Sequence, residues 1–79
     1  MKRTLSELRE YALSLVDDIE FTWNGRHGLI VPFNHRKYIL CFGADDPGTE
    51  FDDVDKMLSC PYLNGHSIAA VCCELVFLR

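Results

Sequence analysis

Residues 19–43, IEFTWNGRHGLIVPFNHRKYILCFG, constrain the fold more than any other stretch, because apolar runs alternate there with turn signals. In the first run, Ile19, Phe21 and Trp23 alternate with polar residues, which is the period of a half-buried strand. Asn24-Gly25 follows, and it is the strongest short hairpin signal because both residues tolerate a positive φ. The start of the stretch therefore predicts one strand and then either a two-residue turn or, because Gly28 follows, a longer loop across Arg26 and His27, so the register of the next strand stays open.

Two further strands are expected at about residues 29–33 and 37–42, separated by a turn at 34–36. Both are apolar at odd and even positions, which is typical of a strand that is buried on both faces or covered by a partner. Pro32 cannot donate to a strand ladder, so it should lie at a strand end or a bulge. Together the three strands predict an antiparallel meander, one face of which has no obvious cover.

The flanking segments favour helices. Residues 4–18 repeat apolar side chains with helical spacing, begin with a Thr4–Glu7 capping box, and should end near two consecutive acidic residues. Residues 44–50 are predicted as a loop, and Asp52 is expected to cap a short helix that Pro61 ends.

The last segment, residues 67–78, has two interpretations. Ser67 is a good N-cap and the apolar spacing is helical, yet VCCELVF is also typical of a strand. We expect a helix there. The sequence therefore predicts a single α+β domain over residues 1–79, with an N-terminal helix, a three-stranded antiparallel meander, and then one short and one C-terminal helix.

Size and composition bear on stability and location. A chain of 79 residues buries only about 60% of its unfolded surface, so a small domain often gains stability from a partner. The N-terminus is charged throughout, and no stretch approaches the ~20 apolar residues of a membrane span. We expect a cytoplasmic protein, with no membrane partner, whose four cysteines are thiols.

The segment EFDDVDKMLSCPYLNGHSIAAV resembles the tail of small uncharacterised proteins from Gram-positive bacteria and their prophages. The matching residues are Phe51, Asp52, Asp53, Asp55, Leu58, Pro61, Gly65, Ser67 and Ile68. The resemblance implies a helix, a meander and a helical pair, and it supports the helical interpretation of residues 67–77. It implies no activity. Ala69 and Ala70 stand where an acidic residue is more usual.

No catalytic, cofactor or metal site is assigned from the sequence. Four Cys and three His lack the close pairs of a structural zinc site. A small Cys/His metal-dependent protein or enzyme, using Cys60, His66 and Cys72 or Cys73, is one alternative. The acidic run of residues 45–55 does not fit a calcium-binding loop.

A nucleic-acid accessory role is the other alternative. Basic residues lie in both hairpin turns, Arg26 in the first and Arg36 in the second, and Trp23, Phe33 and Tyr38 are near them. Aromatic side chains beside basic ones can stack on bases. The net charge of −4 argues against nucleic-acid binding, because such proteins need a positive surface.

The leading hypothesis is a non-catalytic protein-binding or regulatory module, acting on a protein partner or as a homodimer. The apolar strands and the acidic run supply its candidate surfaces. The candidate interface residues are Trp23, Ile30, Tyr38, Ile39, Leu40, Asp45, Asp46, Asp52 and Asp53.

Overall fold

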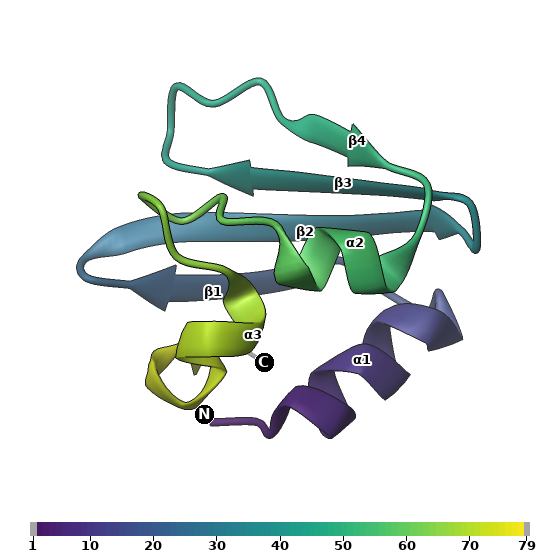
Figure 1. Cartoon of the computed structure of the whole chain (residues 1–79), viewed down its shortest axis with the longest axis horizontal. Helices are drawn as coiled ribbons and strands as arrows, with labels where there is room; N and C mark the ends of the chain where they lie inside the picture. Colours follow the sequence, from purple (N-terminus) through teal and green to yellow (C-terminus); the bar gives the residue numbers. More distant parts are fainter. Residues whose placement is uncertain (1, 79) are drawn as a thin grey trace.

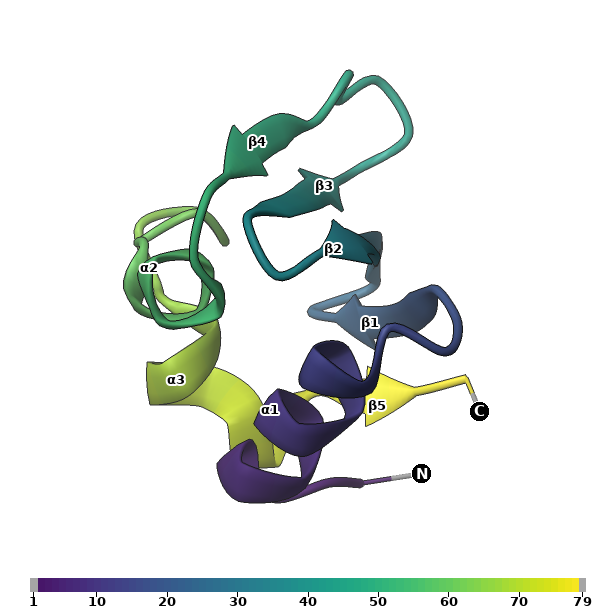
Figure 2. The same ribbon diagram turned by 90° about the vertical axis from the view of Figure 1, so that its right-hand side faces the viewer.

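The computed structural model describes residues 2–78, which form a helical layer packed on one face of an antiparallel sheet. The sheet has five strands in the order β4-β3-β2-β1-β5. Figure 1 shows the strands running across the molecule, and Figure 2 shows α1, α2 and α3 on the same side of them. The α+β class, the N-terminal helix, the meander and the later short helices are confirmed.

The elements in chain order are α1 (Leu5–Ser14), β1 (Ile19–Trp23), β2 (Arg26–Asn34), β3 (Lys37–Phe42), β4 (Thr49–Phe51), α2 (Val54–Ser59), α3 (Ile68–Val71), a 3₁₀ turn (Cys72–Glu74) and β5 (Val76–Phe77).

Helix α1 starts as expected and ends earlier than expected. The Thr4 hydroxyl accepts from the Glu7 N–H at 3.1 Å, and the Glu7 carboxylate accepts from the Thr4 N–H at 2.8 Å, which completes the capping box. Leu15 then adopts a left-handed conformation (φ 56°) and closes the helix. The acidic residues at 17 and 18 therefore lie beyond the helix, where the helix dipole no longer opposes them.

The β1–β2 hairpin is closed by two residues with positive φ, Asn24 at 50° and Gly25 at 75°. This turn pairs Trp23 with Arg26, so β2 starts three residues before the predicted strand. Arg26 consequently belongs to the strand rather than to the turn. The ladder between β2 and β3 shifts between Pro32 and Asn34, which places the proline at a bulge as expected.

The sheet is wider than predicted, because two strands form outside the meander. Thr49–Phe51 pairs with β3 as β4, where a loop was expected. The last segment combines both interpretations: Ser67 caps a helix of four residues, and the chain then pairs Val76 and Phe77 with β1 as β5. The two added strands contain only three and two residues, too few to produce a recognisable alternation, and β5 pairs with a strand more than fifty residues away.

The hydrophobic core lies between the helices and the facing side of the sheet. Phe21, at the centre of β1, is fully buried and contacts the rings of Phe42 and Phe77 at 6.4 and 6.2 Å between centroids. Its partner in β2 is Gly28, and a Cβ there would overlap the Phe21 ring. Leu8 and Ala12 bring α1 onto this core.

Candidate functional site: the open face of the sheet

Side chains along β1, β2 and β3 alternate between two faces of very different surroundings. In β3 every second residue is buried, and in β2 burial alternates from Gly28 to Pro32. The buried set faces the helices. We call the opposite set the open face; it consists of Glu20, Thr22, His27, Leu29, Val31, Phe33, Lys37, Ile39, Cys41, Glu50 and Val76.

The centre of the open face is apolar. Leu29 lies opposite Cys41, and Val31 lies opposite Ile39, so two cross-strand pairs form one patch on neighbouring strands. All four side chains are only half-buried. Phe33, at the end of β2, is 55% exposed. All helices within residues 2–78 lie on the side of the sheet opposite to this patch (Figure 2).

The charged groups of the open face pair with one another around this patch. Lys37 Nζ lies 3.8 Å from Glu50 Oε1 and also 5.0 Å from the centre of the Phe33 ring. His27 Nε2 lies 3.2 Å from Glu20 Oε2. These pairs are partly exposed, so each contributes little to stability. With histidine counted as neutral, the two carboxylates outnumber the one ammonium group among these residues.

One corner of the open face carries a loop. A Cβ at Gly48 would lie 2.8 Å from both Cys41 Sγ and Ile39 Cγ2, so this loop packs directly on the two side chains. Asp46 fixes the loop, because its carboxylate accepts from the N–H groups of Phe42 and Gly48, each at 2.9 Å.

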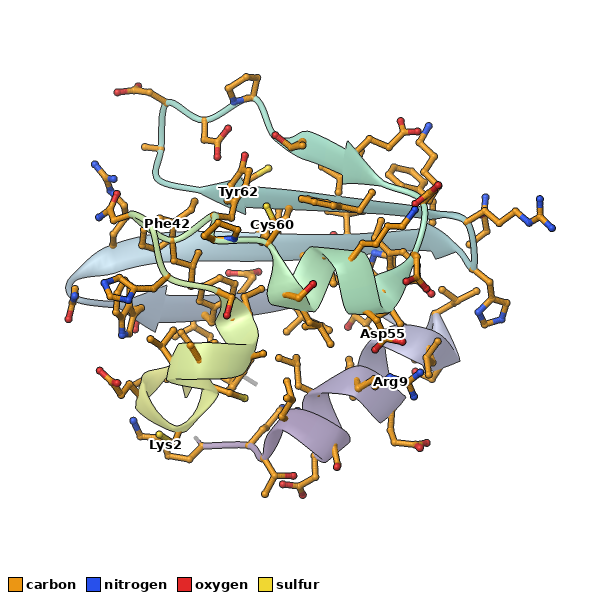
Figure 3. All side chains as sticks on the ribbon, viewed as in Figure 1. Lys2, Arg9, Phe42, Asp55, Cys60 and Tyr62 are labelled. Carbon is orange, nitrogen blue, oxygen red and sulfur yellow. The ribbon has the colours of Figure 1, made fainter. Side chains whose placement is uncertain are left out.

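The same carboxylate accepts from the Tyr62 hydroxyl at 2.6 Å, which ties the loop to the segment after α2. The Tyr62 hydrogen bond and the Gly48 N–H hold the pKa of Asp46 below its usual value, despite a smaller opposing effect of burial. Burial and the neighbouring Asp46 raise the pKa of Tyr62. Figure 3 shows Tyr62 lying toward β3, beside Cys60.

The candidate interface residues that were predicted from the strands lie on both faces of the sheet. Trp23, Ile30, Tyr38 and Leu40 belong to the core, with at most 6% of each side chain exposed, so they cannot contact a partner. Ile39 lies on the open face. The physical reason is the period of two: residues that are adjacent in a strand point to opposite faces.

The sequence reasoning did not select Leu29, Val31 and Phe33, although a signal for them was present. A two-residue turn at Asn24-Gly25 pairs Trp23 with Arg26, and this register fixes which residues of β2 share the face of Trp23. From the sequence alone the length of this turn was undecided, so the pairing of β1 with β2, and with it the face of each β2 residue, was not determined.

The four acidic candidates have different surroundings. Asp46 supports its loop, as described above, and Asp45 beside it is exposed. Asp53, rather than Asp52, caps α2, since its side chain accepts from the Lys56 N–H. Asp52 instead lies 3.2 Å from Lys56 Nζ. Two of the four carboxylates thus satisfy backbone groups, which is a structural role.

The cysteines and histidines behind the metal or enzyme alternative have dissimilar environments. Cys72 is buried, its Sγ lies 3.6 Å from the Arg3 carbonyl oxygen, and burial raises the pKa of its thiol. Cys73 is exposed. His66 lies edge-on to the Trp23 ring, 5.4 Å between centroids. Across residues 2–78 no group of three or more His, Cys, Asp or Glu is placed to hold a metal ion.

The features behind the nucleic-acid alternative are also dispersed. The β1–β2 and β2–β3 turns lie at opposite ends of the meander, so Arg26 and Arg36 do not form one patch. Of the three aromatic residues proposed to stack on bases, Trp23 and Tyr38 are buried and Phe33 is exposed.

A second surface feature is a hollow of about 530 Å³ between the start of α1 and α3. Its walls include Lys2, Leu5, Ala70 and Cys73. Arg3 also borders it, with the guanidinium over the rings of Tyr11 (4.8 Å) and Phe77 (5.7 Å). Figure 3 places Lys2 beside α3, and it shows Arg9 and Asp55 pointing toward one another between α1 and α2. Arg9 Nε lies 2.8 Å from Asp55 Oδ1.

Comparisons of the chain with protein-family models, with curated proteins and with solved structures find no match. The resemblance of residues 50–71 to small proteins of Gram-positive bacteria and prophages stays a prediction. Within the part of the chain that the structure describes, no helix is long and apolar enough to cross a membrane.

Proposed function

We propose that this chain is a non-catalytic protein-binding module whose working surface is the open face. The observation that carries the proposal is the position of the helices, all on one side of the sheet within residues 2–78, which leaves the pairs Leu29–Cys41 and Val31–Ile39 only half-buried on the other. Solvated faces of antiparallel sheets are usually polar. An apolar centre on such a face is the mark of a surface that a protein covers.

The energetic argument is one of scale. Removing apolar surface from water stabilises a complex by roughly 25 cal/mol per Å². A chain of 79 residues has a small core, so covering a second apolar face contributes a large share of the attainable stability. A regulatory role in the cytoplasm belongs to the same proposal, and the resemblance of residues 50–71 supports only a bacterial or prophage origin.

Binding of a fluorescent dye that recognises exposed apolar surface tests this proposal. Dilute wild-type protein should enhance the dye's fluorescence, and the Val31→Lys variant should reduce that enhancement several-fold while keeping its far-ultraviolet circular dichroism. Leu5→Glu provides the control, because Leu5 is also partly exposed (36%) but lies in α1, in the helical layer. Equal dye binding by wild type and Val31→Lys would contradict the proposal.

A further inference from the structure

We infer that the loop of residues 43–48 is a strap that limits access to one corner of the open face, and that the hydrogen bond from Tyr62 to Asp46 is its latch. This inference rests on the proposed function, because it concerns the regulation of the same surface. The corner consists of Ile39 and Cys41, two half-buried residues of β3 that the strap contacts. When the latch opens, these two side chains become accessible to a partner.

The strap lies in direct contact with the corner that it covers. A Cβ at Gly48 would lie 2.8 Å from Cys41 Sγ and 2.8 Å from Ile39 Cγ2, so no other molecule fits between the strap and these atoms. Cys41 is half-buried although the helices of residues 2–78 lie on the other side of the sheet. The position of the strap therefore determines how much of the patch formed by the pairs Leu29–Cys41 and Val31–Ile39 a partner can reach.

The strap is attached by hydrogen bonds rather than by a buried apolar side chain. Ala44, Asp45 and Pro47 are exposed. Gly43 and Gly48, at the two ends, have φ values of 102° and 96°. Glycine adopts this conformation and others at little cost, so both ends can act as hinges. A segment with few buried apolar contacts opens at a much lower free-energy cost than the core does.

The hydrogen bonds of the strap converge on one carboxylate. Asp46 accepts from the N–H of Phe42, just before the strap, and from that of Gly48, at its end, each at 2.9 Å. These two bonds close the loop on itself. The Tyr62 hydroxyl donates to the same carboxylate at 2.6 Å and fastens the strap to the segment after α2. A hydrogen bond to an ionised group is stronger than one between neutral groups, so its loss should loosen the strap.

The thiol, the carboxylate and the hydroxyl at this corner are close enough to affect one another's ionisation. Burial and, after it, the Asp46 carboxylate raise the pKa of the Cys41 thiol. Burial, the bond to Asp46 and, more weakly, Cys41 raise the pKa of Tyr62. Both groups therefore keep their protons near neutral pH. The closed strap leaves Cys41 covered and in its unreactive thiol form, so its rate of alkylation reports on opening.

Alkylation of Cys41 by an uncharged maleimide near neutral pH, followed for each cysteine by mass spectrometry, tests the latch. Tyr62→Phe removes the latch hydroxyl and keeps the Asp46 charge, so a faster reaction reports access and not the loss of a neighbouring carboxylate. Cys41 in this variant should react about tenfold faster than in wild type, the factor that corresponds to one hydrogen bond of this kind. Tyr11→Phe, which makes the same change in α1, is the matched control and should leave the rate unchanged.

Cys72 shows in the same experiment whether the whole fold has loosened, because its side chain is buried in the core and only 5% exposed. Its rate of alkylation should be equal in wild type and Tyr62→Phe. The fluorescence of the apolar dye should be higher with Tyr62→Phe than with wild type, because the loosened strap uncovers Ile39 and Cys41.

Three results would overturn the inference, and a fourth concerns the proposed function alone. An equal Cys41 rate in wild type and Tyr62→Phe would show that the hydroxyl is no latch. Equal acceleration of Cys41 and Cys72 would show that the fold opens as a whole. Faster alkylation of Cys41 alone, with unchanged dye binding, would show that the strap does not control the open face. Dye binding that Val31→Lys leaves unchanged contradicts the proposed function, whatever the rate at Cys41.

Discussion

The two faces of β2 and β3 are built from similar residues but have different surroundings. Ile30 and Leu40 are fully buried under the helices, while Val31 and Ile39, their neighbours in sequence, are only half-buried on the open face. Composition cannot distinguish these residues, because all four are aliphatic. The difference shows that the position of the helices, and not the hydrophobicity of the strands, determines which side chains form the core.

The two faces should also differ in whether a substitution affects the stability of the fold or its association with a partner. Residues of the inner face pack against α1, α2 and α3, so changes there should act on folding. Residues of the open face have fewer partners within the chain, so changes there should act mainly on association. The predictions below test this division, starting with the largest effect.

Truncation of neighbouring residues in β3 should give very different losses of stability. Leu40→Ala should lower the free energy of unfolding by about 2–5 kcal/mol, because it leaves a cavity in a fully buried site. Ile39→Ala should lower it by about 1 kcal/mol or less in dilute protein, because its side chain is already half-exposed. Urea denaturation measures both, and equal losses would erase the distinction between the faces.

A methyl group added to the inner face should also be costly. Gly28→Ala places a Cβ against the Phe21 ring, so we expect a loss of about 1–3 kcal/mol from overpacking. The adjacent open-face variant His27→Ala is the control and should change stability by about 0.5 kcal/mol or less. Thermal unfolding followed by circular dichroism measures the difference in stability. A Gly28→Ala variant as stable as wild type would show that the Phe21 ring does not pack closely against Gly28.

The loop on the corner of the open face should depend on pH through Asp46. The folded-state pKa of Asp46 is lowered, so its carboxylate stabilises the fold above the unfolded pKa of about 3.9, and this contribution is lost as pH falls through the lower folded value. Asp46→Asn should therefore cost about 1 kcal/mol at pH 7, and less as pH falls from about 5 to about 2.

Tyr62→Phe distinguishes the hydrogen bond from the charge itself. This variant keeps the Asp46 carboxylate and removes its shortest contact, so it should raise the pKa of Asp46 toward its usual value. Nuclear magnetic resonance titration of the carboxyl carbon provides the measurement. An unchanged Asp46 pKa in Tyr62→Phe would show that the backbone N–H groups alone stabilise the carboxylate.

A similarly small effect on stability is expected at the start of α1, far from the open face. Thr4→Ala removes the hydroxyl that accepts from the Glu7 N–H and should cost about 1 kcal/mol. Thr4→Ser keeps the hydroxyl and should restore most of this loss. Neither variant should change the dye binding of the open face, since both act within the helical layer.

Local signals in the sequence predicted the local features of the fold. The capping box at Thr4, the hairpin at Asn24-Gly25 and the proline at a bulge each depend on a few adjacent residues, and each is present. Strand β5 was not chosen over a helix because its partner β1 lies more than fifty residues away, whereas β4 lies one short loop after β3 and was missed because of its length. Only two or three residues pair in each, too few to produce a recognisable alternation.

The candidate surface was predicted as a region but not residue by residue. The excess of apolar side chains in β2 and β3 correctly raised the question of what covers their second face. Choosing Ile30 and Leu40 with Ile39 combined both faces, because the register was left open. A two-residue turn after Trp23 would have separated them, since a shift of one residue exchanges the faces.

A titration with the apolar dye, followed in methyl nuclear magnetic resonance spectra, tests most directly whether the open face, and not the inner face, is the working surface. The account predicts that adding the dye to dilute protein shifts the methyl signals of Leu29, Val31 and Ile39 along one saturating curve. The signals of Ile30 and Leu40 should stay nearly constant, because the core does not change. Shifts confined to the helical layer, or an absence of shifts on the open face, would contradict it.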